Sequence, residues 1–445
     1  MKKLFPRRTA LVTGGCLAAA TAWGQSNYAT PYTFVTIAGN ATSSGSANGT
    51  NSSAQFTYPE GVAVDAHGNL FVADNFANTI RKAAPVGTNW VVTTIAGQVG
   101  VYGSANGTNG VAQFSEPVGL AVDMHSNIFV ADFGNNTVRK ITPVGTNWVV
   151  KTIAGTAGNT GGADGTNGFA QFNGPAALAV DTHSNVFLAD SLNHTIRKIS
   201  PLGTNWVVTT IAGTAGNHGP ADGSNGVAQF NQPSGIALDA AGNLFVADTY
   251  NSTIRKISPA GTNWVVTTIA GQAGNGGSAD GVNLFAQFYE PAGLAVDSAD
   301  NLFVADTFNH TIRKLTPAGA NWVVTTLAGT VQIPGSRDGT GASAQFKSPA
   351  GVAVDSAGNL FVADSGNATL RQGQFVTVPN LTISRAALAS VVVAWPNLGS
   401  YTLQTNPTLL ATSWGNYGGA VTTLSGTNQI TLPASSGNLF FRLTH

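Results

Sequence analysis

Only three of the 20 acidic residues of this 445-residue sequence are glutamates, Glu60, Glu116 and Glu290, and none of them recurs in every unit of the sequence. Carboxylates are metal ligands and proton-transfer groups, and an enzyme needs one asymmetric set of them. Glu116 and Glu290 share one column of the repeat described below, whereas Glu60 stands two places further on in its own unit. A metal cluster built from these three glutamates is therefore one hypothesis for the chemistry of the chain.

The seven histidines give a weaker case for catalysis or metal binding. Three recur 58 residues apart in a predicted turn, which favours solvated turn residues over ligands: His67, His125 and His183. His194 and His310 lie two periods apart, and His218 stands alone in a glycine-rich loop. Neither an HExxH motif nor a Ser-His-Asp arrangement stands out. We therefore expect no catalytic residue among them.

The composition excludes several classes of protein. Only 9% of residues are charged, 20 basic against 20 acidic, and 54 are glycine. Few Lys and Glu residues argue against helical bundles, and the absence of a basic tract argues against a nucleic-acid partner. The single cysteine, Cys16, excludes an internal disulfide framework. The sequence leaves the oligomeric state open.

Residues 1–24 have the pattern of a secretory signal peptide. A basic start containing Arg7 and Arg8 precedes an apolar stretch, and Ala22-Trp23-Gly24 provides small residues at the cleavage site. The pattern leaves general secretory and twin-arginine export open. No later stretch reaches about 18 apolar residues, so we expect no membrane span. The predicted location is secreted: extracellular, periplasmic or at the cell surface.

A repeat of 58 residues organises the sequence that follows. Three of its columns are the following: Phe56, Phe114, Phe172, Phe230, Phe288 and Phe346; Asp74, Asp132, Asp190, Asp248, Asp306 and Asp364; Arg81, Arg139, Arg197, Arg255, Arg313 and Arg371. Each unit contains four short β-branched runs bounded by turn residues. In the fourth unit these runs are 235–239, 243–247, 253–257 and 264–269, which we name strands a, b, c and d.

Four antiparallel strands per unit without a helical period predict an all-β chain with a six-bladed β-propeller of four-stranded blades. There are six copies of a, b and c but only five copies of d that follow them. Residues 33–39 match the end of strand d, so the N-terminal strand should complete the blade of residues 349–374. This prediction closes the ring and assigns residues 30–374 to the propeller.

The repeats resemble the NHL-repeat family of six-bladed propellers. Asp190-Ser-Leu-Asn193-His194 and Asp306-Thr-Phe-Asn309-His310 match the family's signature closely, and the other units replace the histidine. The resemblance implies the propeller fold. It does not fix the function, because propellers of this family bind proteins or RNA, or act as hydrolases and lyases.

A binding face is predicted where the d–a and b–c loops meet, because residues there vary between units. The candidate binding residues are Phe76, Tyr102, Phe133, Leu192, Tyr250 and Phe308. Exposed aromatic residues beside carboxylates suit a protein, peptide or carbohydrate ligand, whereas the same residues could instead pack under the loops. The sequence favours a non-catalytic binding or scaffold protein. The alternative is a metal-dependent hydrolase or lyase of the gluconolactonase or streptogramin-lyase type.

No cofactor is expected, with calcium as the alternative. Oxygen-rich loops carry a column of aspartates, although their spacing is not that of a known calcium loop: Asp164, Asp222, Asp280 and Asp338.

The periodic pattern ends near Gln374. Residues 381–445 contain several predicted strands and Trp395 and Trp414, which suggest a small β-sandwich. This segment resembles the immunoglobulin- or fibronectin-like modules of secreted bacterial proteins.

Overall fold

The computed structural model describes residues 10–12, 32–375, 381–387, 390–396, 402–406, 414–424, 427–433 and 439–444. The described strands form two compact units, one within residues 27–376 and one made of β1 and the strands beyond residue 377. The predicted signal peptide lies outside the described residues, except for β1 (Ala10–Val12), which pairs with β38 (Leu439–Thr444).

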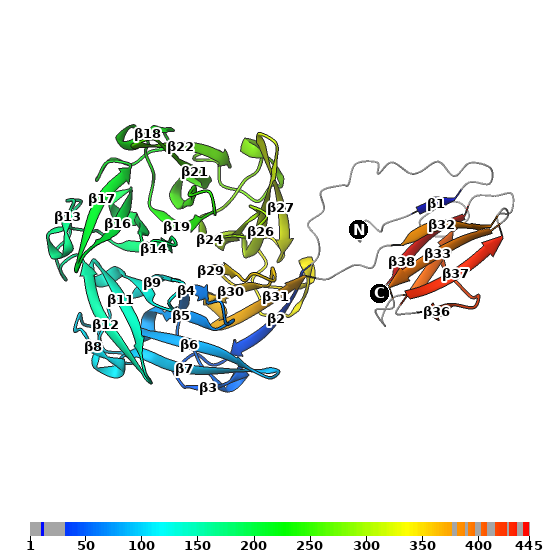
Figure 1. Ribbon diagram of the computed structural model, residues 1–445, viewed down its shortest axis with the longest axis horizontal. Coiled ribbons are helices and arrows are strands. Elements are labelled where there is room, and N and C mark those ends of the chain that lie inside the picture. Colours follow the sequence, from blue (N-terminus) through cyan, green and yellow to red (C-terminus); the bar gives the residue numbers. More distant parts are fainter. Residues whose placement is uncertain are drawn as a thin grey trace. The chain divides into compact units, whose positions relative to one another are not determined.

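The first unit is a closed ring of six antiparallel sheets, which confirms the predicted six-bladed propeller (Figure 1). Each sheet has five strands, one more than the sequence predicted. The a strands lie nearest the centre of the ring and the d strands near its rim (Figure 1). The extra strand, here named e, has two residues and pairs with the outer edge of strand d.

The strands have matching bounds in every blade. The a strands are β4 (Pro59–Val64), β9 (Pro117–Val122), β14 (Pro175–Val180), β19 (Pro233–Leu238), β24 (Pro291–Val296) and β29 (Pro349–Val354). The b strands are β5 (Leu70–Asp74), β10 (Ile128–Asp132), β15 (Val186–Asp190), β20 (Leu244–Asp248), β25 (Leu302–Asp306) and β30 (Leu360–Asp364). The c strands are β6 (Thr79–Val86), β11 (Thr137–Val144), β16 (Thr195–Leu202), β21 (Thr253–Ala260), β26 (Thr311–Ala318) and β31 (Thr369–Phe375).

The outer strands follow the same pattern. The d strands are β7 (Asn89–Gly97), β12 (Asn147–Ala154), β17 (Asn205–Ala212), β22 (Asn263–Ala270), β27 (Asn321–Ala328) and, for the sixth blade, β2 (Tyr32–Gly39). The e strands are β3 (Gly49–Thr50), β8 (Gly107–Thr108), β13 (Gly165–Thr166), β18 (Gly223–Ser224), β23 (Gly281–Val282) and β28 (Gly339–Thr340). A 3₁₀ turn links b to c in each blade: η2 (Asn75–Ala77), η4 (Phe133–Asn135), η6 (Ser191–Asn193), η8 (Thr249–Asn251), η10 (Thr307–Asn309) and η12 (Ser365–Asn367).

Side chains of the repeat fix the turns between these strands. In the a–b turn of blade four, the Asp239 carboxylate accepts hydrogen bonds from the backbone N–H groups of Ala241 and Asn243 and from the Asn243 amide. Such local bonding explains why Asp begins each a–b turn. At the rim, the Asn225 Oδ1 accepts the backbone N–H of Trp264 at 2.8 Å. This bond tethers the e–η7 segment to strand d; η7 spans Asn225–Val227.

Apolar residues of neighbouring blades form the core. Between blades three and four, Phe187 and Ile196 pack with Phe230 and Leu244, and all four are buried. Near the axis the a strands approach closely, and a Cβ at Gly235 would collide with the carbonyl oxygen of Ala292 in the next blade. The small residue at this place therefore lets the six inner strands close around the axis.

The N-terminal strand β2 closes the ring as predicted, because it pairs antiparallel with β31 of the sixth blade. Tyr32 takes the place that tryptophan holds in the other d strands, and its ring lies 6.2 Å from that of Phe303. Phe34 stands opposite Gly373 in the register, where the other blades pair a valine with an alanine, isoleucine or leucine. The large Phe34 ring in β2 is thus matched by a glycine, which has no side chain, in β31.

The second unit contains two four-stranded sheets, ordered β1-β38-β34-β35 and β32-β33-β37-β36. Its further strands are β32 (Thr382–Ala387), β33 (Ser390–Pro396), β34 (Thr402–Asn406), β35 (Gly415–Asn416), β36 (Thr422–Leu424) and β37 (Thr427–Pro433). Val393, Trp395 and Ile430 of one sheet share a buried cluster with Leu403 and Phe441 of the other. This shared core makes the unit a small β-sandwich.

Within the described residues, no helix has both the length and the apolar character needed to cross a membrane.

Candidate functional site

The periodic aspartates and arginines form a buried network under the d–a and b–c loops. In blade four, the Arg255 guanidinium donates to the Asp248 carboxylate at 2.6 Å and to the Asp222 carboxylate at 2.7 Å. It also donates to the backbone carbonyls of Gln229 and Ala221, both at 2.9 Å. Asp248 and Arg255 are fully buried. Burial raises the pKa of Asp248, and the neighbouring guanidinium opposes that shift. These aspartates hold the loops in place.

The column of aspartates considered for calcium takes part in the same network. Each of the four binds the arginine of its own blade through Oδ1: Asp164, Asp222, Asp280 and Asp338. Asn48 and Asn106 occupy this place in the first two blades and accept the same bond. Since a neutral amide replaces the carboxylate twice, the column serves arginine binding in all six blades.

The signature histidines connect neighbouring blades. The Nδ1 atoms of His194 and His310 each accept a backbone N–H, from Gln232 and from Ser348, at 3.1 Å. Between blades one and two, the Oδ1 atom of Asn78 takes the place of the histidine nitrogen and accepts the backbone N–H of Glu116. Burial and then the nearby His218 lower the pKa of His194. An Nδ1 acceptor and a lowered pKa describe a neutral imidazole that holds the next blade's loop.

The turn histidines lie on the face opposite these loops. Each backbone N–H donates to the aspartate two residues earlier: His67 to Asp65, His125 to Asp123 and His183 to Asp181. The His67 side chain is 79% exposed. The a–b turns therefore present these rings to solvent, in keeping with their periodic spacing.

The b–c tips carry the predicted binding residues on the loop face. Four tip residues occupy equivalent places and are partly exposed: Phe76 (54%), Leu192 (38%), Tyr250 (50%) and Phe308 (48%). Glycine stands there in the other two blades, at Gly134 and Gly366. Tyr102, in the loop between blades one and two, is also exposed. The tips thus differ from blade to blade on an otherwise repeated scaffold.

Neighbouring aromatic rings support two of the tips. Tyr58 stacks on Phe76 with ring centroids 4.9 Å apart, and Tyr289 lies 5.3 Å from Phe308. Phe133 stands one place earlier in its turn than the other tips and is half-buried. Sequence reasoning did not single out Tyr58 and Tyr289. The sequence feature that could have identified them is an aromatic residue just before strand a, where the other units carry mainly small or polar residues.

The three glutamates do not gather into one cluster. Glu60 is the second residue of β4, and the Asn75 amide donates to its Oε2 at 3.5 Å. Burial raises the pKa of Glu60 to about 7, with the Glu116 charge as the second cause. Burial alone raises the pKa of Glu290. Among the residues that the structure describes, no three His, Cys, Asp or Glu side chains come close enough to hold a metal ion.

The charge of Glu60 should make the propeller less stable as pH rises. Its folded-state pKa of about 7 exceeds the ordinary value of 4.5, so the folded state holds the proton more tightly than the unfolded state. The stabilising contribution is complete below pH 4.5 and is lost as pH rises towards 7. We expect Glu60→Gln to be more stable than the wild type by about 1–3 kcal/mol at pH 8.

Urea unfolding of the wild type and Glu60→Gln, measured from pH 4 to pH 8, checks this expectation. The two proteins should have similar midpoints at the acidic end and diverge as the carboxyl ionises. Glu290→Gln separates the two causes, because burial raises the pKa of Glu290 without a second carboxylate. Parallel pH profiles for the wild type and Glu60→Gln would contradict the assignment.

The closed ring of six antiparallel sheets, with its repeated loop network, defines the first unit as a six-bladed β-propeller. The chain contains NHL repeats, matched at residues 230–257, 288–315 and 346–372.

Comparisons with known proteins agree with this class. The chain is 30% identical to the chloroplastic protein SUPPRESSOR OF QUENCHING 1 of Arabidopsis thaliana over 328 residues, covering 71% of this chain and 30% of that protein. It is 29% identical to human NHL repeat-containing protein 2 over 294 residues, covering 60% of this chain and 40% of that protein. The chain thus spans less than half the length of these curated relatives.

A crystal structure of an auxiliary nutrient binding protein from Bacteroides ovatus is similar in fold, with a TM-score of 0.58 and 17% identity. The match covers 78% of this chain and 77% of that chain. At this level of identity the similarity establishes the fold.

Proposed function

We propose that this chain is a secreted, non-catalytic binding protein whose propeller holds a protein, peptide or carbohydrate ligand on the loop face. The observation that carries the proposal is the set of half-exposed tips, Phe76, Tyr250 and Phe308, at equivalent places in three blades. Large aromatic side chains held in place lose little conformational entropy on binding, so they are effective contact residues.

The buried network supports this proposal because it makes the loop face rigid. The tip turn η8 follows directly after Asp248, and the Asn251 amide donates to that carboxylate at 2.7 Å. The same amide donates to the Gly219 carbonyl of the adjacent d–a loop at 2.8 Å. A binding surface that is ordered before the ligand arrives avoids part of the entropic cost of association.

The fold comparison and the N-terminal sequence support the location and the ligand class. Solved structures of the same fold include auxiliary nutrient binding proteins of Bacteroides. Residues 1–24 have the pattern of a signal peptide, so export is part of the proposal. The C-terminal β-sandwich would then act as an immunoglobulin- or fibronectin-like spacer or attachment module.

Alanine replacement of Tyr250 and Phe308 tests the loop face. The full chain would be screened on oligosaccharide and peptide arrays, and the best binder titrated into each variant. Tyr250→Ala and Phe308→Ala should each weaken binding at least about tenfold, the effect of losing a central aromatic contact. Leu202→Ala is the matched control, because Leu202 is 63% exposed in the c–d turn on the opposite face. Unchanged affinity in both aromatic variants would reject this face as the site.

The alternative of a metal-dependent hydrolase or lyase is favoured by one observation. Glu60 and Glu116 interact electrostatically, and the raised pKa of Glu60 is suited to a general acid near neutral pH. The test is hydrolysis of gluconolactone by the full chain with added Ca²⁺ or Zn²⁺. Activity that Glu60→Gln abolishes would replace the binding proposal with an enzymatic one.

A further inference from the structure

On the face formed by the a–b and c–d turns, opposite the loop face, neighbouring blades meet at six equivalent junctions, each of which is called a groove below. In each groove an aromatic ring of strand b meets, at a steep angle, an aromatic ring from strand d of the next blade: Phe71–Trp148, Phe129–Trp206, Phe187–Trp264, Phe245–Trp322, Phe303–Tyr32 and Phe361–Trp90. A lysine of strand c lies over the phenylalanine in four of them: Lys140, Lys198, Lys256 and Lys314. The grooves are therefore built on one plan.

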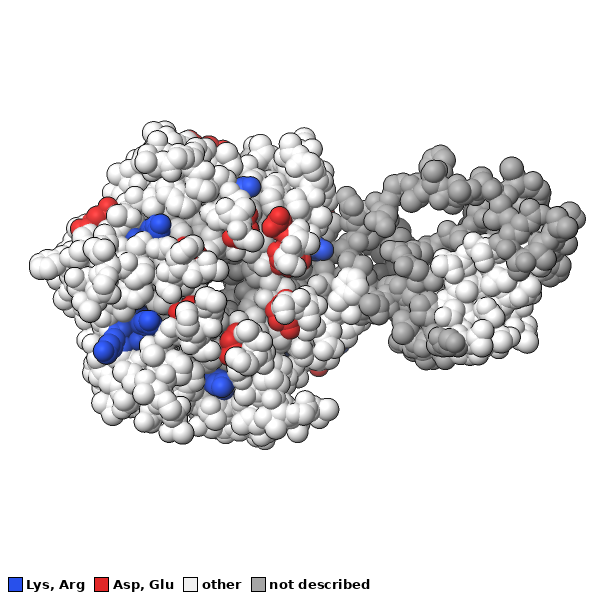
Figure 2. All heavy atoms as spheres, in the orientation of Figure 1, with Lys and Arg blue, Asp and Glu red and all other residues white. Residues whose placement is uncertain are grey.

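Charges on this face follow the order of the strands. The a–b turn carboxylates belong near the axis and the c-strand lysines further out, because strand a is innermost. Figure 2 shows acidic groups around the centre of the ring on the face in view and basic groups further out, with a few more acidic groups at the outer edge. A groove that runs outward from the axis consequently meets an acidic end first and a lysine next.

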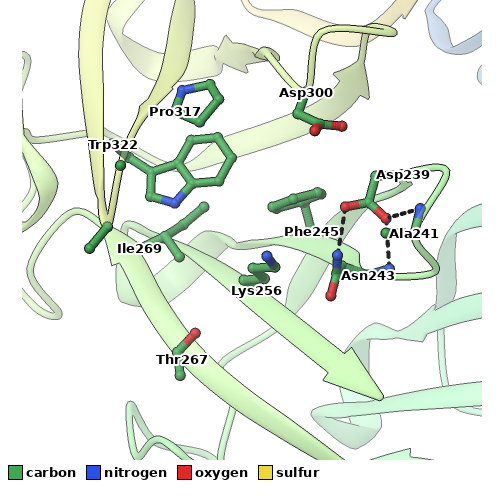
Figure 3. A pocket seen from close by; sticks show the side chains of 12 residues that line it. Asp239, Ala241, Asn243, Phe245, Lys256, Thr267, Ile269, Asp300, Pro317 and Trp322 are labelled. Carbon is green, nitrogen blue, oxygen red and sulfur yellow. Dashed lines mark hydrogen bonds between the residues drawn. The ribbon is translucent and has the colours of Figure 1, made fainter. Parts of the chain in front are cut away.

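The groove between blades four and five opens into a pocket of about 420 Å³ (Figure 3). Trp322, Phe245 and Pro317 provide apolar walls, and Lys256 and Asp300 bring charges to the same space. This volume lies within the range of about 300–1,000 Å³ usual for small-molecule sites.

One residue, Asp300, is found in this groove alone, whereas the alanine in place of a turn histidine is shared with blades five and six, which carry Ala299 and Ala357. Ala241 replaces the histidine of the first three a–b turns, so no ring stands at this place. Asp300 occupies a left-handed position, φ +60°, where the other units carry only glycine or serine: Gly68, Ser126, Ser184, Gly242 and Gly358. This groove therefore combines the Asp300 carboxylate with an alanine, a lysine and a tryptophan. None of the other five grooves within residues 32–375 has this combination.

The polar groups of this pocket are available to a ligand. Within the described part of the chain, the Asp300 carboxylate has no hydrogen-bond partner, and Lys256 has no carboxylate within ion-pair distance. Asp239, by contrast, is occupied by its own turn. The pocket thus offers an acceptor at Asp300, a donor at Lys256 and the flat ring of Trp322.

The charges of the pocket residues determine which kind of ligand fits. An anion would face the Asp239 and Asp300 carboxylates, and a cation would face the Lys256 ammonium. A hydroxyl group suits both neighbours, because it donates to a carboxylate and accepts from an ammonium. A ring with an apolar C–H face and several hydroxyls matches the indole wall and both charged groups.

We propose that the groove between blades four and five binds one pyranose unit of a neutral carbohydrate. The sugar ring stacks on Trp322, its hydroxyls donate to Asp300 and accept from Lys256, and Ala241 leaves the entrance open. This site is separate from the loop face, so the chain has two binding surfaces on opposite sides of the ring.

The indole N–H signals of the ¹⁵N-labelled full chain test the proposal. Trp322→Tyr, a change that Tyr32 already represents in the sixth blade, assigns the Trp322 signal by its disappearance. Cellohexaose, xylohexaose, maltohexaose and mannohexaose would each be titrated to about 10 mM, enough to reveal millimolar affinity. At least one should shift the Trp322 signal in a saturable way. No shift with any of the four would overturn the proposal.

Substitutions borrowed from equivalent positions then separate ligand contacts from folding. Asp300→Gly and Ala241→His each introduce a residue that another unit carries at the same place, and each should weaken binding at least about tenfold. Ser184→Gly makes a comparable turn change in the groove between blades two and three and should leave the affinity unchanged. Equal affinity in the wild type, Asp300→Gly and Ala241→His would overturn the assignment. Tyr250→Ala should not alter this binding, which distinguishes it from the loop face.

Discussion

Replacing Arg255 with methionine is expected to lower the free energy of unfolding of the propeller by about 3–5 kcal/mol. The guanidinium is fully buried and makes four hydrogen bonds, to Asp248, Asp222 and the carbonyls of Gln229 and Ala221. Methionine fills much of the space but leaves the Asp248 charge buried without its cation. Urea unfolding followed by tryptophan fluorescence measures the loss.

Asp222→Asn is the matched control for Arg255→Met. Asn48 and Asn106 hold this position in blades one and two, where they accept arginine at 3.0 and 2.9 Å. Because Asp222 is also half-exposed, the neutral variant should cost no more than about 1 kcal/mol. A loss below about 1 kcal/mol for Arg255→Met would contradict a central role for the network.

The same arginine links stability to the loop face. Its bonds to Ala221 and Gln229 hold both ends of the segment that leads into strand a, and Asp248 begins the b–c tip. Loss of Arg255 should therefore loosen the tip at Tyr250 as well as lower stability. Faster amide exchange in the two loops of blade four, with the other blades unchanged, would separate this local effect from global unfolding.

The repeat made most of the propeller predictable from the sequence. Columns such as Asp74 and Arg81 recur at one spacing, and the missing sixth strand d, together with residues 33–39, indicated how the ring closes. The fifth strand of each blade was not predicted, because two residues carry no alternation pattern. It pairs with strand d through its backbone, and the bond of Asn225 to the backbone of Trp264 holds the turn that follows it.

The candidate sites were harder to predict because they depend on residues that leave the repeat. Tip residues such as Tyr250 could be found by their variation, but the sequence could not tell exposed rings from packed ones. Phe133 illustrates this limit, since its place in the turn differs by one residue and it is half-buried. The pocket at Trp322 joins Ala241 and Asp300 from two different turns, which only the packing of neighbouring blades brings together.

Gly373→Ile is expected to destabilise the ring closure by several kcal/mol, because a Cβ at this position already falls within 3 Å of the Phe34 ring. Phe34→Val should also destabilise, by about 2–4 kcal/mol, since it leaves a cavity against Phe346 in the buried core. Either change weakens the pairing of β2 with β31, and an opened ring exposes a strand edge that promotes association between chains.

The double variant Phe34→Val with Gly373→Ile should recover most of the lost stability. It recreates the pair that blades two, three and four carry at the same register, for example Val150 opposite Ile141. A double-mutant cycle by urea unfolding, with the oligomeric state followed by light scattering, should give a coupling energy of at least about 2 kcal/mol. Additive losses would show that the two residues do not act as a matched pair. Recovery would show that Phe34 and Gly373 are matched in size across the strand pair that closes the ring.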